Sequence, residues 1–380
     1  MSRILVSLVS QQTIPNVLFV NEIKDVERYL FITTEKMEEI NKREIIIEAC
    51  DCINDDNSTY IIVFEDSIKD LQYELEMFVD KETDDGDTFI VNLTGGTKLM
   101  SIGAFDFFKD YKSEIYYIPF GKNTYRQIFP DVKHREFDLK YRFTLDGYLK
   151  ANGISVLGKA SVLKYDIEIT KNIFKIFEEN KIIKYLDLLT ELRDQSNKYW
   201  YKQKNKKYVK DFTNAKKLND LLKSINWNIQ QVDKYDIKYL TGGWFEEYLF
   251  YFCSQIFDND NLGSNYKLDL GSSVDNEFDV LFVHENYLYI IEAKTNLKGV
   301  AGSNIINNII YKSSSLNAEF GLSCKSYLFH LDKEFEQKQN YANYIKRAEL
   351  MGLKVIGPDE LTPSKIVSTI KNLLSNKVVL

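Results

Sequence analysis

Three residues in the second half of the chain have types and spacing that suit metal-assisted hydrolysis: Asp279, Glu292 and Lys294. They lie in two apolar runs, residues 277–283 and 287–294, which a short polar break separates. Both runs are rich in β-branched and aromatic residues, so the pattern predicts a β-hairpin. If the turn is a two-residue loop at 285–286, period-two alternation places all three side chains on one face, with Asp279 opposite Glu292.

Two carboxylates and an ammonium on one face of an apolar hairpin are costly unless they hold a ligand. Carboxylate oxygens are preferred ligands of divalent cations such as Mg²⁺ or Mn²⁺. A lysine beside the metal can orient or deprotonate a water. The sequence therefore predicts a metal site on Asp279 and Glu292, with Lys294 acting on the water. The alternative is a solvated face with a cross-strand salt bridge.

The hairpin resembles the core of the PD-(D/E)XK nuclease superfamily, in which one strand carries an acid and the next carries Glu-x-Lys. Asp279, Glu292 and Lys294 match those three positions, although Phe278 stands where the superfamily name has proline. The resemblance also implies a glutamate on the preceding helix. Glu246 is our choice for it because the helical pattern places it closer to the buried edge, and its neighbour Glu247 is the alternative.

The elements around the hairpin follow the order expected of that superfamily. The pattern predicts a helix over 244–257, a strand over 266–270, the hairpin, a helix over 305–315 and a strand over 326–331. A helix near 342–351, a strand at 354–357 and a last helix from 363 complete the chain. Asn308 and Lys312 lie on the polar face of the predicted helix 305–315, from which they can reach the site.

The first 145 residues alternate strand and helix signals, which predicts a parallel, doubly wound sheet. The strands are expected at 4–8, 29–33, 60–64, 88–93 and 115–120, with helices at 67–80 and 98–111. Ligands of such sheets bind beyond the carboxyl ends of the strands. Two loops are expected there: residues 10–16, and the Thr94-Gly95-Gly96-Thr97-Lys98 segment. A glycine pair before a helix suits a phosphate, but by itself it is more often a structural turn.

The two loops together resemble those of the CARF domain, a Rossmann-like sensor of cyclic oligoadenylates. That resemblance implies a homodimer whose paired loops bind one cyclic tetraadenylate as an allosteric activator. The implied ligand-binding residues are Ser10, Gln12, Thr94, Gly96, Thr97 and Lys98.

Between the two predicted α/β domains the alternation stops. Residues 146–230 are expected to form a helical, winged-helix-like connector, with helices at 145–150, 169–178 and 185–193. Residues 198–210 within it are rich in lysine and aromatic residues. This stretch is either a solvated connector or a surface that follows the backbone of a single strand and stacks its bases. The domain boundaries expected from these patterns are 1–145, 146–230 and 231–380.

Composition restricts the function and the location of the protein less strongly than the motifs do. The formal net charge of −7 argues mildly against a general nucleic-acid coat protein, although a local basic channel remains compatible with it. Four cysteines without a C-x-x-C pair suit a reduced cytoplasmic protein. No signal peptide and no apolar run of membrane-spanning length are recognisable, so no membrane partner is expected.

Both resemblances, in this order along the chain, imply a type III CRISPR accessory effector. Its expected function is a metal-dependent endonuclease, activated by cyclic tetraadenylate, that cuts single-stranded DNA or RNA and possibly nicks supercoiled DNA. Two alternatives remain open: a ligand-sensing DNA-binding regulator with an inactive nuclease domain, and a ring nuclease that degrades the cyclic messenger.

Overall fold

The computed structural model describes residues 1–119, 121–160, 162–200, 215–229, 232–270, 276–297, 305–321 and 323–375. Two compact units divide the chain. Unit 1 holds residues 1–156 with two short later segments, 285–287 and 319–323. Unit 2 holds residues 157–284, 288–318 and 324–380.

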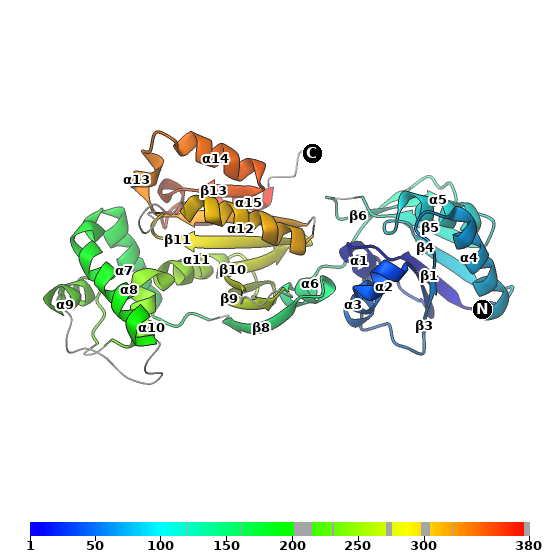
Figure 1. Cartoon of the computed structure of the whole chain (residues 1–380), viewed down its shortest axis with the longest axis horizontal. Helices are drawn as coiled ribbons and strands as arrows, with labels where there is room; N and C mark the ends of the chain where they lie inside the picture. The colour runs from blue at the N-terminus through cyan, green and yellow to red at the C-terminus, as the bar shows by residue number, and fades with distance from the viewer. Residues whose placement is uncertain are drawn as a thin grey trace. The chain divides into compact units, whose positions relative to one another are not determined.

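Unit 1 is built on a seven-stranded sheet with the order β3-β2-β1-β4-β5-β6-β7 (Figure 1). Neighbouring strands from β3 to β5 are parallel, and β6 and β7 continue the sheet antiparallel. The strands are β1 (Arg3–Leu8), β2 (Arg28–Thr33), β3 (Ser58–Ile62), β4 (Thr88–Asn92), β5 (Ser113–Tyr117), β6 (Thr124–Phe129) and β7 (Glu136–Asp138). The helices are α1 (Ile14–Glu22), α2 (Glu35–Glu39), α3 (Lys42–Glu48), α4 (Ile68–Glu82), α5 (Lys98–Phe108) and α6 (Leu145–Ala151).

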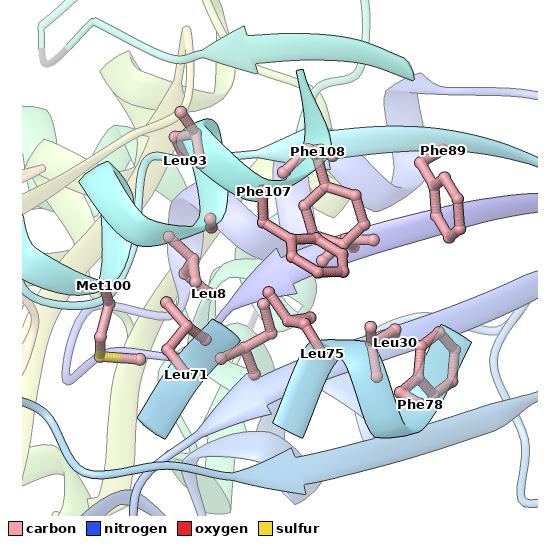
Figure 2. Packing of buried hydrophobic residues seen from close by; sticks show 14 of the residues in the cluster. Leu8, Leu30, Leu71, Leu75, Phe78, Phe89, Leu93, Met100, Phe107 and Phe108 are labelled. Carbon is pink, nitrogen blue, oxygen red and sulfur yellow. The ribbon is translucent and has the colours of Figure 1, made fainter. Parts of the chain in front are cut away.

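The central strands are buried on both faces, which explains their unbroken apolar runs. On one face, α4 and α5 cover the sheet with side chains such as Leu71, Leu75 and Phe108 (Figure 2). On the other face, the Phe19 ring of α1 lies 5.5 Å from the Tyr116 ring. Each such buried side chain contributes roughly 1.5–3 kcal/mol. The predicted doubly wound sheet is confirmed, with strands close to their expected positions.

Two local expectations for unit 1 were wrong. Residues 10–16 do not form one loop, because α1 already begins at Ile14. Pro15 lies in its first turn, where a missing N–H costs nothing, and that position was the available signal. The antiparallel strands β6 and β7 were also missed. Their side chains are only partly buried, so they lack the apolar run of a central strand.

Unit 2 is built on a six-stranded sheet with the order β13-β12-β11-β10-β9-β8. Strand β11 is parallel to β12, and β12 is parallel to β13, whereas β9 and β10 are antiparallel. The strands are β8 (Ser155–Ala160), β9 (Leu262–Asp269), β10 (Asn276–His284), β11 (Tyr287–Lys294), β12 (Cys324–His330) and β13 (Leu353–Ile356). The expected order of helix, three strands, helix and strand is confirmed.

Helices cover both faces of this sheet. Helix α12 (Ile305–Glu319) packs Ile306 and Ile310 against Leu328 on one face. On the other face, the rings of Phe257, Phe282 and Tyr289 stack in succession, with centroids 4.3 and 4.6 Å apart. Also in unit 2 are α11 (Trp244–Ser254), η3 (Asn259–Asn261), α13 (Lys333–Glu336), α14 (Tyr341–Leu350), η4 (Pro358–Glu360) and α15 (Ile366–Ser375).

The expected helical connector 146–230 was wrong in one part, because β8 lies within it and pairs with β9 as an outer strand of the unit 2 sheet. The chain that follows β8 is mainly helical up to Gly243. Its elements are α7 (Ile167–Glu178), η1 (Lys181–Tyr185), α8 (Leu186–Trp200), α9 (Ala215–Ser224), α10 (Lys234–Lys238) and the π-helical turn η2 (Tyr239–Gly243). It packs on α11, since the Phe174 ring of α7 stacks on the Tyr248 ring of α11 at 4.5 Å. Most of the lysine-rich stretch 198–210 lies outside the described residues.

The four cysteines are free. A search of the described residues for a helix long and apolar enough to cross a membrane finds no candidate.

Candidate functional sites

The hairpin β10–β11 places the predicted catalytic residues. Its turn consists of Glu285 and Asn286, which both have positive φ, at 51° and 62°. Positive φ at both central residues defines a two-residue type I′ turn, and asparagine tolerates this conformation. Because only these two residues separate His284 from Tyr287, the two strands pair in the register predicted from the sequence, which places Asp279 opposite Glu292.

Three side chains meet on one face of this hairpin. The Lys294 ammonium lies 2.6 Å from Glu292 Oε1 and 3.6 Å from Asp279 Oδ2. The Asp279 carboxylate also accepts a hydrogen bond of 2.7 Å from the Ala293 backbone N–H. Asp279 is only 9% exposed, and Glu292 and Lys294 are partly exposed. One buried and two accessible groups give a site that a ligand can reach from one side.

The charges of this cluster are strongly coupled. Burial, together with repulsion from Glu292, raises the pKa of Asp279 to about 8, although Lys294 opposes the shift. Burial alone would lower the pKa of Lys294, but attraction to Asp279 and Glu292 outweighs it and raises that pKa. The ammonium therefore stays charged at neutral pH, and the site still lacks positive charge for its carboxylates.

Helix α11 adds the third predicted acid. Burial raises the pKa of Glu246, Lys238 and Lys294 oppose the rise, and the Glu292 carboxylate adds to it. Glu246 thus lies in the field of the hairpin cluster. Its neighbour Glu247 instead accepts a 3.2 Å hydrogen bond from the Tyr165 backbone N–H. The two glutamates therefore have different surroundings, and only Glu246 interacts with the residues of the hairpin.

Three further charged residues belong to this cluster. Glu277 shares the face of Asp279 and forms a 3.1 Å ion pair with Lys238 of α10. The field of Glu277, Glu246 and Asp279 raises the pKa of Lys238 against the effect of its burial. No sequence signal marked Lys238, because it is remote from the hairpin in the chain. Lys312 of α12 lies 3.9 Å from Glu292 Oε2, whereas Asn308 is exposed on the same helix.

The donor set suits a divalent cation. Within the described ranges, no three His, Cys, Asp or Glu side chains are arranged as a ready-made metal site. The Lys294 ammonium lies between Asp279 and Glu292, where it offsets their charge. Carboxylates with raised pKa values are relieved by a cation, which exchanges for their protons. Asp279 and Glu292 therefore offer carboxylate oxygens of the type that hard divalent cations prefer, although they do not form a complete ligand set with a third acid in the described residues.

The predicted sensor loops lie at the carboxyl ends of β1 and β4. A buried amide network ties them together: Asn16 donates to the Leu8 carbonyl and accepts from the Asn92 amide. Asn92 Oδ1 in turn accepts a hydrogen bond of 2.6 Å from the Thr94 hydroxyl. The Thr94 hydroxyl oxygen accepts a hydrogen bond from the Ile118 N–H. The network holds the ends of β1, β4 and β5 together, as a ligand site at this edge requires.

Three of the six predicted ligand residues line one cavity in unit 1. Ser10, Gln12 and Thr94 border a cavity of about 270 Å³, together with Tyr117 and other residues. Residues Gly96, Thr97 and Lys98 do not border this cavity.

The Gly95-Gly96 pair has structural reasons of its own. A Cβ on Gly95 would lie 1.9 Å from the Leu8 carbonyl oxygen, and Gly96 has φ +69°. Thr97 caps α5 by accepting from the Met100 N–H, and its hydroxyl donates 2.7 Å to the Glu65 carbonyl. Lys98 is exposed at the first position of α5. The turn is thus explained by backbone geometry, whether or not a ligand also binds there.

Comparison with known families gives two matches. Residues 4–148 match the Card1 CARF domain, and residues 233–377 match the Card1-like endonuclease domain. The chain therefore belongs to the family of proteins that join a CARF domain to a Card1-like endonuclease domain. A comparison with curated protein sequences finds no match.

Two solved structures share the fold over nearly the whole length. The chain is similar to Can2 from Sulfobacillus thermosulfidooxidans in complex with cyclic tetra-adenylate, with a TM-score of 0.72, 21% identity, and coverage of 97% of this chain and 98% of Can2. It is also similar to protein VC1899 from Vibrio cholerae, with a TM-score of 0.72, 20% identity and coverage of 98% and 97%.

Proposed function

We propose that this protein is a metal-dependent endonuclease of type III CRISPR defence that cyclic tetraadenylate activates. Its proposed substrates are single-stranded DNA or RNA, with nicking of supercoiled DNA as a further activity, in the cytoplasm. The endonuclease and CARF family matches support the nuclease and the sensor. The observation that carries the proposal is the approach of Lys294 to both Glu292 and Asp279 on a buried hairpin.

The nuclease residues have distinct proposed tasks. Asp279 and Glu292, with help from Glu246, would hold Mg²⁺ or Mn²⁺, and that cation would supply a Lewis acid for the phosphodiester and an activated water. Lys294, whose ammonium stays charged because Asp279 and Glu292 raise its pKa, would orient that water and would not deprotonate it, and the hydrogen bond from the Ala293 N–H keeps Asp279 in position. Lys238 and Lys312 add positive charge near the acids, where the anionic backbone of a nucleic acid must approach.

The sensor is proposed to act as a homodimer. Ser10, Gln12, Thr94, Gly96, Thr97 and Lys98 from both copies would surround one cyclic tetraadenylate. A ring with repeated phosphates matches a two-fold site, because each copy then offers the same groups to half of the ligand. Can2, which has the same fold, was solved with cyclic tetra-adenylate, and this supports the choice of ligand. The proposed domains are the sensor at 1–145, the connector at 146–230 and the nuclease domain at 231–380.

The test compares wild type with Glu292→Gln on labelled single-stranded DNA and RNA, with Mn²⁺ or Mg²⁺, and with or without cyclic tetraadenylate. The isosteric change removes one negative charge from the site. We expect cleavage only with the cyclic ligand and a loss of at least about 100-fold in the variant. The matched control is Glu349→Gln, at an exposed position of α14, which should cut like wild type.

Three results would change the assignment. Cleavage at the same rate with and without the cyclic ligand would support the nuclease function and contradict activation by the ligand. Loss of the cyclic ligand itself, at equal rates in wild type and Glu292→Gln, would indicate a ring nuclease. No cleavage of any substrate, with retained ligand binding, would favour the ligand-sensing regulator.

A further inference from the structure

A second cavity, of about 290 Å³, lies in unit 2 beside the catalytic strand. Three segments line it: the α7–η1–α8 region, residues 295–296, and residues 331–334. Thr295 and Asn296 directly follow Lys294, the last residue of β11. Because β11 and β12 are parallel, their carboxyl ends open toward the same edge of the sheet, where ligands of such sheets bind.

Hydrogen bonds join this cavity to the catalytic site from two sides. The Leu331 N–H donates 3.1 Å to the Lys294 carbonyl, so the two strand ends are held together. On the opposite wall, Arg193 donates 2.6 Å to the carbonyl of Thr241. Thr241 lies three residues after Lys238, which pairs with Glu277 in the acid cluster. The cavity is therefore connected to the acid cluster through residues 294–296 on one wall and through residues 238–241 on the other.

The chemistry of the walls suits a flat, heteroaromatic group. Ile182, Leu189 and Leu331 are buried apolar residues of the lining. Ile183 and Leu186, which expose 55% and 41% of their surface, extend this apolar lining to the solvent-accessible side of the cavity. Apolar surfaces of this kind receive the faces of an unstacked base.

Polar groups in the same cavity can contact the edges of such a base. Asn180 has φ 57° at the start of η1, and its carboxamide does not cap that helix. Thr190 and Asn296 add a hydroxyl and a second carboxamide to the lining. Amides and hydroxyls both donate and accept hydrogen bonds, as base edges require. Two cations, Arg193 and Lys333, and two acids, Asp332 and Glu334, also line the cavity, so its walls carry no formal net charge and the base contacts must come from the neutral polar groups.

We propose that this cavity is a nucleobase subsite, which holds the base of a nucleotide adjacent to the scissile phosphate. The proposal rests on the nuclease function given above and adds a binding site to it. A base held there fixes the strand across Lys294, so cleavage depends on the presence of that base. A single strand suits this site better than a duplex, because its bases are already free to leave the stack.

The experiment uses single-stranded oligonucleotides that carry one abasic residue, with the cuts mapped in the presence of Mn²⁺ and cyclic tetraadenylate. Wild type should cut a phosphate next to the abasic residue about ten-fold or more slower than the same phosphate of the intact strand. Leu186→Trp fills the cavity from its exposed rim. It should slow the intact strand to the abasic rate and so abolish the difference.

Two further variants refine the test. Asn180→Gly keeps the left-handed backbone and deletes the carboxamide, so it should change the preference among the four bases at that position while cleavage continues. Leu350→Trp makes the same side-chain change as the cavity variant on α14, where Leu350 is 78% exposed. This control should cut intact and abasic strands like wild type.

The outcomes separate the subsite from the nuclease. If wild type cuts intact and abasic strands equally, or if Leu186→Trp slows both by the same factor, the cavity is not a base subsite and the nuclease function stands. If wild type cuts no strand with metal and cyclic ligand, the proposed function fails and the subsite fails with it.

Discussion

Lys294 is the residue on which the charge balance of the proposed nuclease site depends. Its ammonium is 2.6 Å from Glu292 and 3.6 Å from Asp279, and Glu246 adds a third negative group to its surroundings. Removing one member of a buried ion pair leaves the other without compensation, which is strongly destabilising. The lysine is partly exposed, however, and water reduces the effect.

We predict that Lys294→Met lowers the free energy of unfolding of the metal-free protein by about 2 kcal/mol. A divalent cation replaces the lost positive charge, so Mn²⁺ should raise the melting temperature more in the variant than in wild type. Thermal unfolding with and without Mn²⁺ measures both effects. Lys312→Met, at a half-exposed position, should change the stability by no more than about 0.5 kcal/mol. Equal stabilisation of wild type and Lys294→Met by Mn²⁺ would contradict a shared cation site.

His330 makes the stability of unit 2 depend on pH. It is fully buried on β12, and burial lowers its pKa to about 4, with a smaller opposing effect from Asp332. Within the described residues, Nε2 has no hydrogen-bond partner. An unfolded chain binds the proton near pH 6.5, whereas the folded chain resists it. The contribution to stability is therefore complete above pH 6.5 and is lost as the pH falls toward 4.

From this sign we predict that His330 accounts for about 2 kcal/mol of the stability lost between pH 7 and pH 5. In His330→Asn that part of the loss should disappear, although the variant is less stable at pH 7. Urea unfolding at the two pH values measures it. The exposed His134, changed to Asn, serves as the control. An unchanged pH dependence in His330→Asn would show that the histidine is not buried in its neutral form.

At the scale of elements, α5 shows how one residue can serve the fold at a position expected to bind a ligand. Thr97 accepts from the Met100 N–H at the helix start and donates to the Glu65 carbonyl. An N-terminal cap of this kind stabilises a helix by about 1 kcal/mol. A loss of ligand binding in a Thr97 variant is therefore informative only when stability is measured beside it.

We predict that Thr97→Ala lowers the free energy of unfolding of unit 1 by about 1 kcal/mol, whereas Thr97→Ser leaves it nearly unchanged because the hydroxyl remains. Urea unfolding, monitored with a probe that reports on unit 1, measures the difference in stability. The affinity for cyclic tetraadenylate is then compared among the variants that are folded. Equal stability of the Ala and Ser variants would mean that the cap contributes nothing.

At the scale of the whole molecule, the proposed dimer predicts how many cyclic tetraadenylate molecules bind per chain. Two copies that share one ring bind about one cyclic tetraadenylate per two chains. Calorimetric titration of the full chain should give this ratio, and saturating ligand should raise the melting temperature, because it binds only the folded form. A ratio of one ligand per chain would contradict the shared pocket. Lys98→Met should weaken binding if Lys98 contacts a phosphate, without a change in the ratio.

The shared face of Asp279, Glu292 and Lys294 and the order of elements could be predicted because they depend on short-range patterns. Alternation along residues 277–294 and a two-residue turn are enough to place Asp279 opposite Glu292. The buried strands of unit 1 were recognisable from their apolar runs for the same reason. Helix α1 was missed because the polar residues before Ile14 favoured a loop, and its burial against the sheet depends on distant residues.

By itself, the sequence determined the two α/β domains, their order, and the three residues of the hairpin site, since each follows from local periodicity and a resemblance of motifs. Only the tertiary structure decided that Glu246 and not Glu247 faces the hairpin cluster, and that Lys238 and Glu277 pair beside it. It also decided which loop residues border a cavity, and it assembled the second cavity from three distant segments. These features depend on how elements pack against one another, and packing is set by contacts between residues far apart in the chain.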